Sequence, residues 1–168
     1  MLPTEVVTRL GNGVAAAGAS CAIAEPVRVV LDTNTVLDWL LFGDAPANVV
    51  GAAIRDGHLR WLASPRMLAE LQAVLRRPLS ERWNPAREHA LTIDVGVLAT
   101  LCAEPVVASA RLLCRDPDDQ VFIDLAREHG PATLLTRDRA LLSLRRRAVA
   151  FGVVIARAAD WVAAIEPP

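Results

Sequence analysis

Acidic residues are concentrated in one short stretch of the chain. The segment CRDPDDQVFIDLA, residues 114–126, holds Asp116, Asp118 and Asp119 directly before apolar side chains that repeat at helical spacing. Two further aspartates follow short apolar runs: Asp32 comes directly after VRVVL, and Asp138 follows TLLT with one residue between them. Carboxylates that meet at one place repel one another, which raises some of their pKa values, unless a cation neutralises them. These segments therefore predict a divalent-cation site, provided that the fold brings them together.

The chemistry of such a site follows from its ligands. Oxygen ligands without His or Cys favour Mg²⁺, with Mn²⁺ as its substitute, and Mg²⁺ usually keeps several of its waters. Such an ion lowers the pKa of a bound water and stabilises negative charge on a phosphodiester under attack. The acids thus indicate metal-assisted phosphodiester hydrolysis, the reaction of metal-dependent nucleases.

Helix capping is the simpler explanation for the acidic stretch. Asp116 is expected as the N-cap of a helix that runs to about Arg127, with Pro117 at its first position. Asp118 and Asp119 would then lie in the first turn, where an anion gains roughly 0.3–1 kcal/mol from the helix dipole. Periodicity does not rank the three acids.

The other acids also have structural explanations. Asp32 can hold an Asx turn, and Asp138 can cap a helix. Glu70 is a fourth candidate, and it lies about 100° from Leu71 around its predicted helix, on the flank of the apolar stripe. Its side chain can reach over the edge of a sheet or stay solvated beside Arg66. Both interpretations stay open for each acid.

The elements that would position these residues alternate along the chain. Asn34 is the expected cap of the first helix, and Ser64 with Pro65 is a typical helix start. Strands are expected at 27–32, 59–64, 105–113, 133–136 and 148–156, and helices at 35–42, 47–58, 65–77, 86–103, 116–127, 139–144 and 158–165. This alternation predicts an α/β fold, a three-layer sandwich with a parallel central sheet and helices on both faces.

Parallel strands would bring the acids to one edge of that sheet. Asp32 and Asp138 each follow a strand, so parallel pairing places both at the carboxyl ends. A right-handed crossover turns the start of the helix at 116–127 toward the same edge. Functional crevices of open parallel sheets lie at this edge, so we expect one acidic site there.

Composition excludes several other classes of protein. The chain has 168 residues, 53% of them hydrophobic, and no apolar run of the roughly 18 residues that would cross a membrane. Its net charge is −1, and all 18 basic residues are Arg. The absence of Lys argues against a Walker phosphate loop, a Schiff-base enzyme, a receiver domain or a haloacid-dehalogenase-like phosphatase.

The cysteines and the amino terminus bear on location and boundaries. Cys21, Cys102 and Cys114 are odd in number and lack CxxC spacing, which favours a reducing cytoplasm over a disulfide framework. Residues 1–26 are expected to be a flexible or loosely attached extension, and residues 27–168 the folded domain. A signal peptide in this extension is only weakly supported.

Four segments, taken in order, resemble the PIN domain, the nuclease fold of VapC-type toxins. VVLDTNTVLDWL resembles the first strand and turn of that family, with its acid at Asp32 and its following polar residue at Asn34. SPRMLAELQAVLRRP places the second acid at Glu70. CRDPDDQVFIDLA resembles the third segment of the family, in which the ligand precedes a small residue of the helix by seven positions. Asp119 and Ala126 match this spacing. The similarity runs from about residue 27 to residue 165.

The rest of the motif set adds supporting residues. LLTRDRALL resembles the last motif, with Thr136 and Asp138, and Asp116 matches an additional acid of one branch of the family. The resemblance implies a Mg²⁺-dependent endoribonuclease whose metal ligands are Asp32, Glu70, Asp116, Asp119 and Asp138. Arg137 and Arg139 flank the last acid, where they could contact RNA phosphates. The resemblance also implies a homodimer that a small cognate antitoxin inhibits.

Two other functions remain compatible with the same motifs. A housekeeping PIN nuclease of RNA processing would carry the same acids, and a catalytically silent PIN module would bind RNA or a protein without cutting. The histidines, His58, His89 and His129, form no catalytic pattern, and the tryptophans are expected in the core or in dimer contacts. The run Arg145–Arg147 is expected to be a solvated surface rather than an RNA-contacting patch.

Overall fold

A five-stranded parallel sheet forms the centre of the molecule. The computed structural model describes residues 25–78, 80–106 and 112–165. Its strands lie in the order β3-β2-β1-β4-β5, and all neighbours are parallel. Their bounds are β1 Val27–Leu31, β2 Leu59–Ala63, β3 Ala99–Leu101, β4 Ala132–Leu135 and β5 Val153–Ala156. The predicted extension at 1–26 lies outside the described residues except for Glu25 and Pro26.

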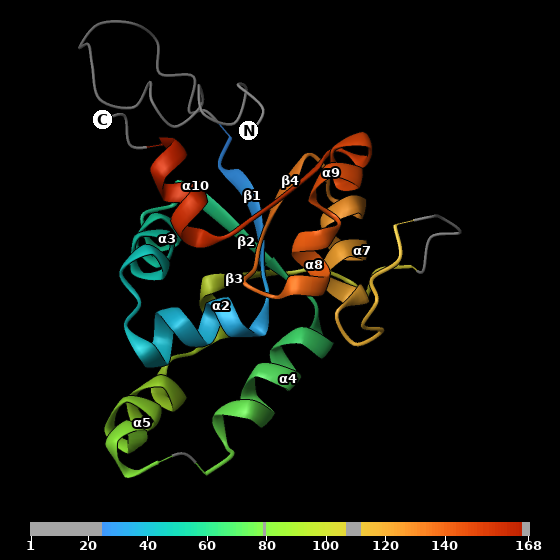
Figure 1. The fold of residues 1–168 in the computed structure, drawn as a ribbon. Coiled ribbons are helices and arrows are strands. Elements are labelled where there is room, and N and C mark those ends of the chain that lie inside the picture. The colour runs from blue at the N-terminus through green and yellow to red at the C-terminus, as the bar shows by residue number, and fades with distance from the viewer. Residues whose placement is uncertain (1–24, 79, 107–111, 166–168) are drawn as a thin grey trace, which may run out of the picture.

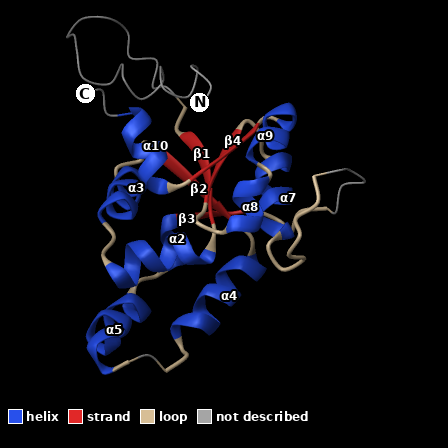
Figure 2. Cartoon of the chain, in the orientation of Figure 1, coloured by secondary structure: helices blue, strands red, loops and turns tan. Residues whose placement is uncertain are grey.

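Helices cover both faces of the sheet, which confirms the predicted fold class. Figure 1 shows α3 and α10 on one side and α7, α8 and α9 on the other, and Figure 2 shows the strands enclosed between them. The first part of the chain supplies α2 Thr33–Leu37, the π-helical turn η2 Asp38–Phe42, α3 Ala45–Arg55, α4 Pro65–Leu75, η3 Glu81–Trp83, α5 Asn84–Thr92 and α6 Val95–Leu98. The second part supplies α7 Gln120–Glu128, α8 Arg139–Ser143, α9 Arg145–Ala148, η4 Val149–Phe151 and α10 Ala158–Ile165. Within the described ranges, none of these helices combines the length and hydrophobicity that a membrane span requires.

The register of the central strands decides which residues meet at the carboxyl edge. Leu31 pairs with Leu135, and Leu135 pairs with Ala156. All three side chains are buried, as expected for strands that are covered on both faces. The residues that directly follow β1, β4 and β5 therefore lie next to one another at the carboxyl edge of the sheet.

The expected helix at 86–103 is wrong, because the chain divides there into two helices and a strand. α5 ends at Thr92, and Asp94 caps a new short helix, with its Oδ1 accepting from the Gly96 amide at 3.0 Å. The chain then enters β3, which pairs with β2 from Ala99 to Leu101. Strand pairing therefore overrides the apolar spacing, which favoured a helix.

The strand expected at 105–113 is also not observed. Residues 105, 106, 112 and 113 have no strand assignment, and residues 107–111 lie outside the described part. The fifth strand of the sheet is β3 instead, which lies at one edge and comes before this segment in the chain.

Three of the four tryptophans lie in the core. Trp39, Trp61 and Trp161 are each at most 5% exposed, and the first two meet edge to face with centroids 6.2 Å apart. The indole of Trp39 packs directly on Gly51 of α3, where an added Cβ would lie 2.1 Å from two of its ring atoms. Only glycine leaves room for the ring at that position. Trp83 is half-buried and stacks edge to face on Phe42.

Candidate functional site

Asp32 lies at the carboxyl end of β1, where it caps the next helix. Its Oδ1 accepts from the Thr35 amide at 2.6 Å, and its Oδ2 accepts from the hydroxyl of Thr136. The side chain is buried, which raises the pKa of Asp32, although the bonds from Thr136 and Thr35 act in the opposite direction. The predicted cap at Asn34 is wrong, because α2 begins at Thr33 and Asp32 already occupies the N-cap position. Asn34 is exposed in the first turn.

Thr136 joins the ends of two strands. Its hydroxyl donates to Asp32 and accepts from the backbone amide of Asp138 at 2.9 Å. Its own amide donates to the carbonyl of Ala156 at 2.9 Å, and the amide of Asp32 donates to the carbonyl of Leu135 at 3.1 Å. One buried threonine thus sets the positions of both aspartates.

Asp138 is the cap of α8, as the sequence predicts. Its Oδ1 accepts from the amides of Ala140 at 2.6 Å and Leu141 at 3.1 Å. Its Oδ2 accepts no hydrogen bond from any described residue. Capping occupies one carboxylate oxygen and leaves the other available to a ligand.

The acidic stretch does not start the helix in the way that the sequence suggests. α7 begins at Gln120, and Asp119 rather than Asp116 occupies its N-cap position. The Oδ1 of Asp116 accepts from the Asp118 amide at 3.0 Å, so Asp116 closes a local Asx turn before the helix. Asp118 is 93% exposed, and its Oδ1 lies 4.0 Å from Nη2 of Arg66.

Gln120 holds the acidic loop against the helix. Its Oε1 accepts from the Cys114 amide at 2.8 Å, and its Nε2 donates to the Leu112 carbonyl at 3.3 Å and to Oδ1 of Asp124 at 2.9 Å. Asp124 is only 7% exposed. Sequence reasoning missed both residues, and the available signal was an acid between apolar neighbours on the buried face of α7.

The electrostatics of Asp119 connect it to the other acids. Its carboxylate has no capping bond, and its pKa is raised to about 6. Partial burial is the largest cause, and the charges of Asp138, Asp116, Asp32 and Glu70 contribute the rest, in that order. The structure therefore brings Asp32, Asp119 and Asp138 into one electrostatic field. Glu70 is exposed on α4 and contributes the least.

The two arginines beside Asp138 have different surroundings. Nη1 of Arg137 lies 3.0 Å from Oδ1 of Asp38 in η2, and the Arg137 charge lowers the pKa of Asp32 and of Asp38. Arg139 is exposed and forms no ion pair with any described residue. Arg137 thus already neutralises part of the acidic edge, whereas Arg139 is available to an external anion.

The acids fit a hard divalent cation by donor type and by charge. In the described part of the chain, no group of three or more His, Cys, Asp or Glu side chains lies close enough together to hold a metal ion. Mg²⁺ does not need such a group, since one or two carboxylates and several waters suffice. The Oδ2 of Asp138 and the carboxylate of Asp119, which does not cap α7, are the oxygens of this kind at the site. A cation here would offset the charges of Asp138, Asp116, Asp32 and Glu70, which are part of what raises the pKa of Asp119.

Comparison with known families identifies the segment that carries these residues. A family model described as PIN domain matches residues 28–140, more than half of the chain. The matched range includes all five acids that the sequence singles out as ligands, Asp32, Glu70, Asp116, Asp119 and Asp138. Comparison with curated proteins gave no match.

The threonine link should be measurable as stability. We expect Thr136→Val to lower the free energy of unfolding by about 1–3 kcal/mol, because it leaves Oδ2 of the buried Asp32 without its donor. Thr136→Ser keeps the hydroxyl and is the matched control. Urea denaturation of the three proteins provides the measurement. A valine variant as stable as the serine variant would contradict this role.

The raised pKa of Asp119 predicts a pH-dependent cost in folding. The folded state holds this proton with a pKa of about 6, against 3.8 for an ordinary aspartate. Stability from this group is therefore present at low pH and lost as pH rises between these values. In metal-free buffer, we therefore expect the stability of Asp119→Asn relative to that of the wild type to be higher at about pH 7 than at about pH 4.5.

Asp118→Asn removes the same charge one position away, from an exposed side chain. Thermal unfolding at both pH values compares the two variants. If the melting temperatures of Asp119→Asn and Asp118→Asn differ by the same amount at both pH values, the burial assigned to Asp119 is wrong.

Proposed function

Because the chain belongs to the PIN domain family, whose members are generally nucleases, we propose that it is a Mg²⁺-dependent endoribonuclease. The observation that carries this proposal is the hydrogen-bonded link from Asp32 through Thr136 to Asp138 at the carboxyl edge of the sheet, and the raised pKa of Asp119 indicates a third acid nearby. These acids come from three segments that are distant in sequence, and a local capping role does not require them to meet. The motif resemblance favours RNA as the substrate.

Each acid has a separate role in this proposal. Asp138 and Asp119 would bind the metal through oxygens that are free of hydrogen bonds from described residues. Asp32 would bind it from a carboxylate that Thr35 and Thr136 hold in one orientation. Glu70 and Asp116 are exposed and would act from the periphery, through water. When bound, the ion supplies a water of lowered pKa and stabilises charge on the phosphodiester.

Supporting residues position the acids and the substrate. Thr136 keeps Asp32 and the start of α8 together, so Asp32 and Asp138 present their oxygens from fixed points. Asn34 is exposed next to Asp32, where its amide can donate to a substrate oxygen. The charge of Arg137 partly opposes the rise in the pKa of Asp32 that burial causes. Arg139 can contact a phosphate.

Cleavage of RNA tests the activity directly. With Mg²⁺ present, we expect the wild-type chain to cut single-stranded RNA, and EDTA to stop the reaction. Asp119→Asn and Asp32→Asn should each lower the rate at least about a hundredfold, the usual cost of removing a group that stabilises the transition state. Asp118→Asn is the matched control and should cut at nearly the wild-type rate.

Each result of this assay has a definite meaning. Equal cutting by all four proteins would indicate contamination or a wrongly assigned site. No cutting by the wild type would favour a silent PIN module. Mn²⁺ titration followed by thermal unfolding separates binding from chemistry, since a bound ion raises the melting temperature. Asp119→Asn should reduce that rise.

We further propose that the chain is the toxin of a type II toxin–antitoxin pair, a cytoplasmic homodimer that a cognate antitoxin inhibits. The likeness of the four motifs to VapC-type toxins supports this role. Val97, Leu101 and Val106 are 80%, 61% and 78% exposed, and apolar side chains at this exposure favour a protein contact. Cys102 and Cys114 are free thiols, which fits a reducing compartment.

The toxin role predicts a specific cellular effect. Expression of the wild-type chain should arrest growth, and co-expression of a small reading frame next to its gene should restore it. Asp119→Asn should not arrest growth. Light scattering should give about twice the 18.1 kDa mass of one chain. Normal growth with active nuclease would instead favour a housekeeping PIN nuclease, and the mass of one chain would exclude the dimer.

A further inference from the structure

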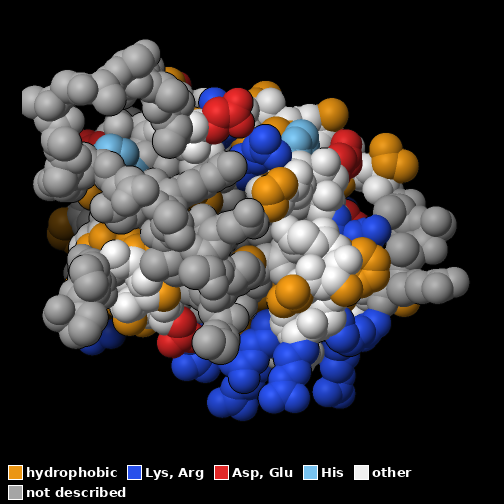
Figure 3. All heavy atoms as spheres, turned by 90° about the horizontal axis from the view of Figure 1, so that it is seen from above, with side chains coloured by type: hydrophobic (Ala, Val, Ile, Leu, Met, Phe, Trp, Pro, Cys, Tyr) orange, Lys and Arg blue, Asp and Glu red, His pale blue; other side chains and the backbone are white. Residues whose placement is uncertain are grey.

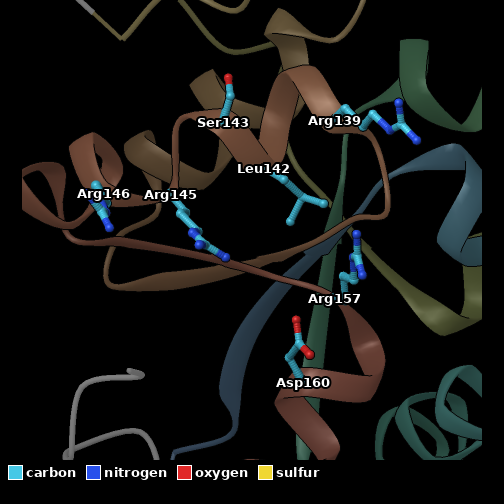
Figure 4. A pocket seen from close by; sticks show the side chains of 7 residues that line it. All are labelled: Arg139, Leu142, Ser143, Arg145, Arg146, Arg157 and Asp160. Atoms are coloured by element: carbon cyan, nitrogen blue, oxygen red, sulfur yellow. The ribbon is translucent and has the colours of Figure 1, made fainter.

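A basic hollow lies beside the acidic site, between α8, α9 and the start of α10. Its volume is about 540 Å³, within the range of roughly 300–1,000 Å³ that is typical of pockets for small ligands. Four arginines line it, Arg139, Arg145, Arg146 and Arg157, and Asp160 is the one acid in its lining. Figure 4 shows Leu142, Arg145, Arg157 and Asp160 directed toward its centre. We call this hollow the arginine pocket.

The arginines of this pocket have no partners within the described structure. None of the four forms an ion pair or a hydrogen bond with another described residue, and all are exposed. Figure 3 shows arginine side chains gathered along one border of the molecule. The lining carries four guanidinium groups and only one carboxylate, that of Asp160, so an anion that enters between them is favoured.

The pocket shares its framework with the acidic site. Arg139 directly follows Asp138, and Arg157 directly follows Ala156, the last residue of β5. The carbonyl of Ala156 accepts from the amide of Thr136, which holds Asp32. The pocket therefore begins one residue from the proposed metal ligands, at the same carboxyl edge of the sheet.

The residue types suit a nucleotide unit. Arg binds phosphate through two parallel N–H donors, which a compact ammonium group cannot do. Leu142 adds a half-buried apolar side chain on which a sugar or base can rest. The expectation for the run Arg145–Arg147 therefore changes, because Arg145 and Arg146 line the pocket and Arg147 is not among its lining residues.

We propose that the arginine pocket binds a backbone phosphate of the RNA strand, on a nucleotide next to the one that is cut. This inference rests on the proposed function, because it assigns the pocket to the substrate of that activity. The pocket orients the strand and takes no part in bond cleavage. Asp160 opposes the phosphate and limits the affinity of the pocket.

RNA binding at different salt concentrations tests the pocket. A fluorescently labelled single-stranded RNA of mixed sequence is titrated in EDTA, so that no cutting occurs. We expect Arg145→Ala with Arg146→Ala to weaken binding about tenfold at low salt. The slope of log K against log salt should fall by about 0.7 for each phosphate contact that is lost.

Two further variants sharpen this experiment. The double variant Arg76→Ala with Arg77→Ala is the matched control, because these adjacent exposed arginines lie at the far end of α4. It should change the affinity less than about twofold, since unpaired surface charges far from the strand contribute little. Asp160→Asn removes the opposing charge and should tighten binding. Urea denaturation confirms that each variant is folded.

The outcomes separate the pocket from the activity. Equal losses in both double variants, or an unchanged salt slope, would overturn the pocket. If Arg145→Ala with Arg146→Ala leaves RNA binding unchanged but abolishes binding of a polyglutamate peptide, the pocket binds an acidic protein segment and is not an RNA site. In the presence of Mg²⁺, the pocket variant should raise KM and keep kcat. A wild type that binds RNA through these arginines but never cuts it would refute the activity alone.

Discussion

The parallel pairing of β1 with β4 is the constraint on which the candidate site depends. It aligns Leu31 with Leu135, so the next residues of the two strands, Asp32 and Thr136, lie within reach of one hydrogen bond although they are 104 positions apart. The same threonine hydroxyl accepts from the amide of Asp138. A shift of register by one residue would turn the side chains of a strand to the opposite face and separate these groups. The fold therefore makes the site through backbone pairing, before any metal or substrate is considered.

Like charges at one sheet edge oppose folding, and the chain offsets this cost with helix caps. Asp32 caps α2, Asp138 caps α8, and Asp119 occupies the cap position of α7. Each carboxylate thus lies beside unpaired backbone N–H groups, where negative charge is favoured. Asp119 lacks a capping bond, and partial burial together with the neighbouring carboxylates raises its pKa to about 6. Capping and metal binding are therefore compatible roles. Asp119, which makes no capping hydrogen bond, is the acid that a cation would stabilise most.

Charge separation over a short distance is the second feature of this edge. The net charge of −1 conceals an acidic group at the ends of β1 and β4 and a basic group after β5 and along α8 and α9. Arg137 lies between them and is paired with Asp38, whereas Arg139 lines the arginine pocket. Under the proposed function, an RNA strand presents phosphates at regular spacing, so one phosphate would meet the acids through a metal while another meets the arginines. Local charge therefore carries more information about the partner than net charge does.

The sequence by itself determined the fold class, the helix starts at Ser64 and Asp138, and the places of Asp32 and Asp138 after parallel strands, because apolar spacing and capping are local signals. It did not determine which hydrogen bonds those acids make. Three features became visible only in the tertiary structure, two of them because they depend on residues far apart in the chain. β3 forms in a segment of helical spacing because β2 offers a pairing partner. α7 begins late because an Asx turn and Gln120 hold the acidic loop. Two arginines of a surface run line a pocket because β5 and α10 place Arg157 opposite them.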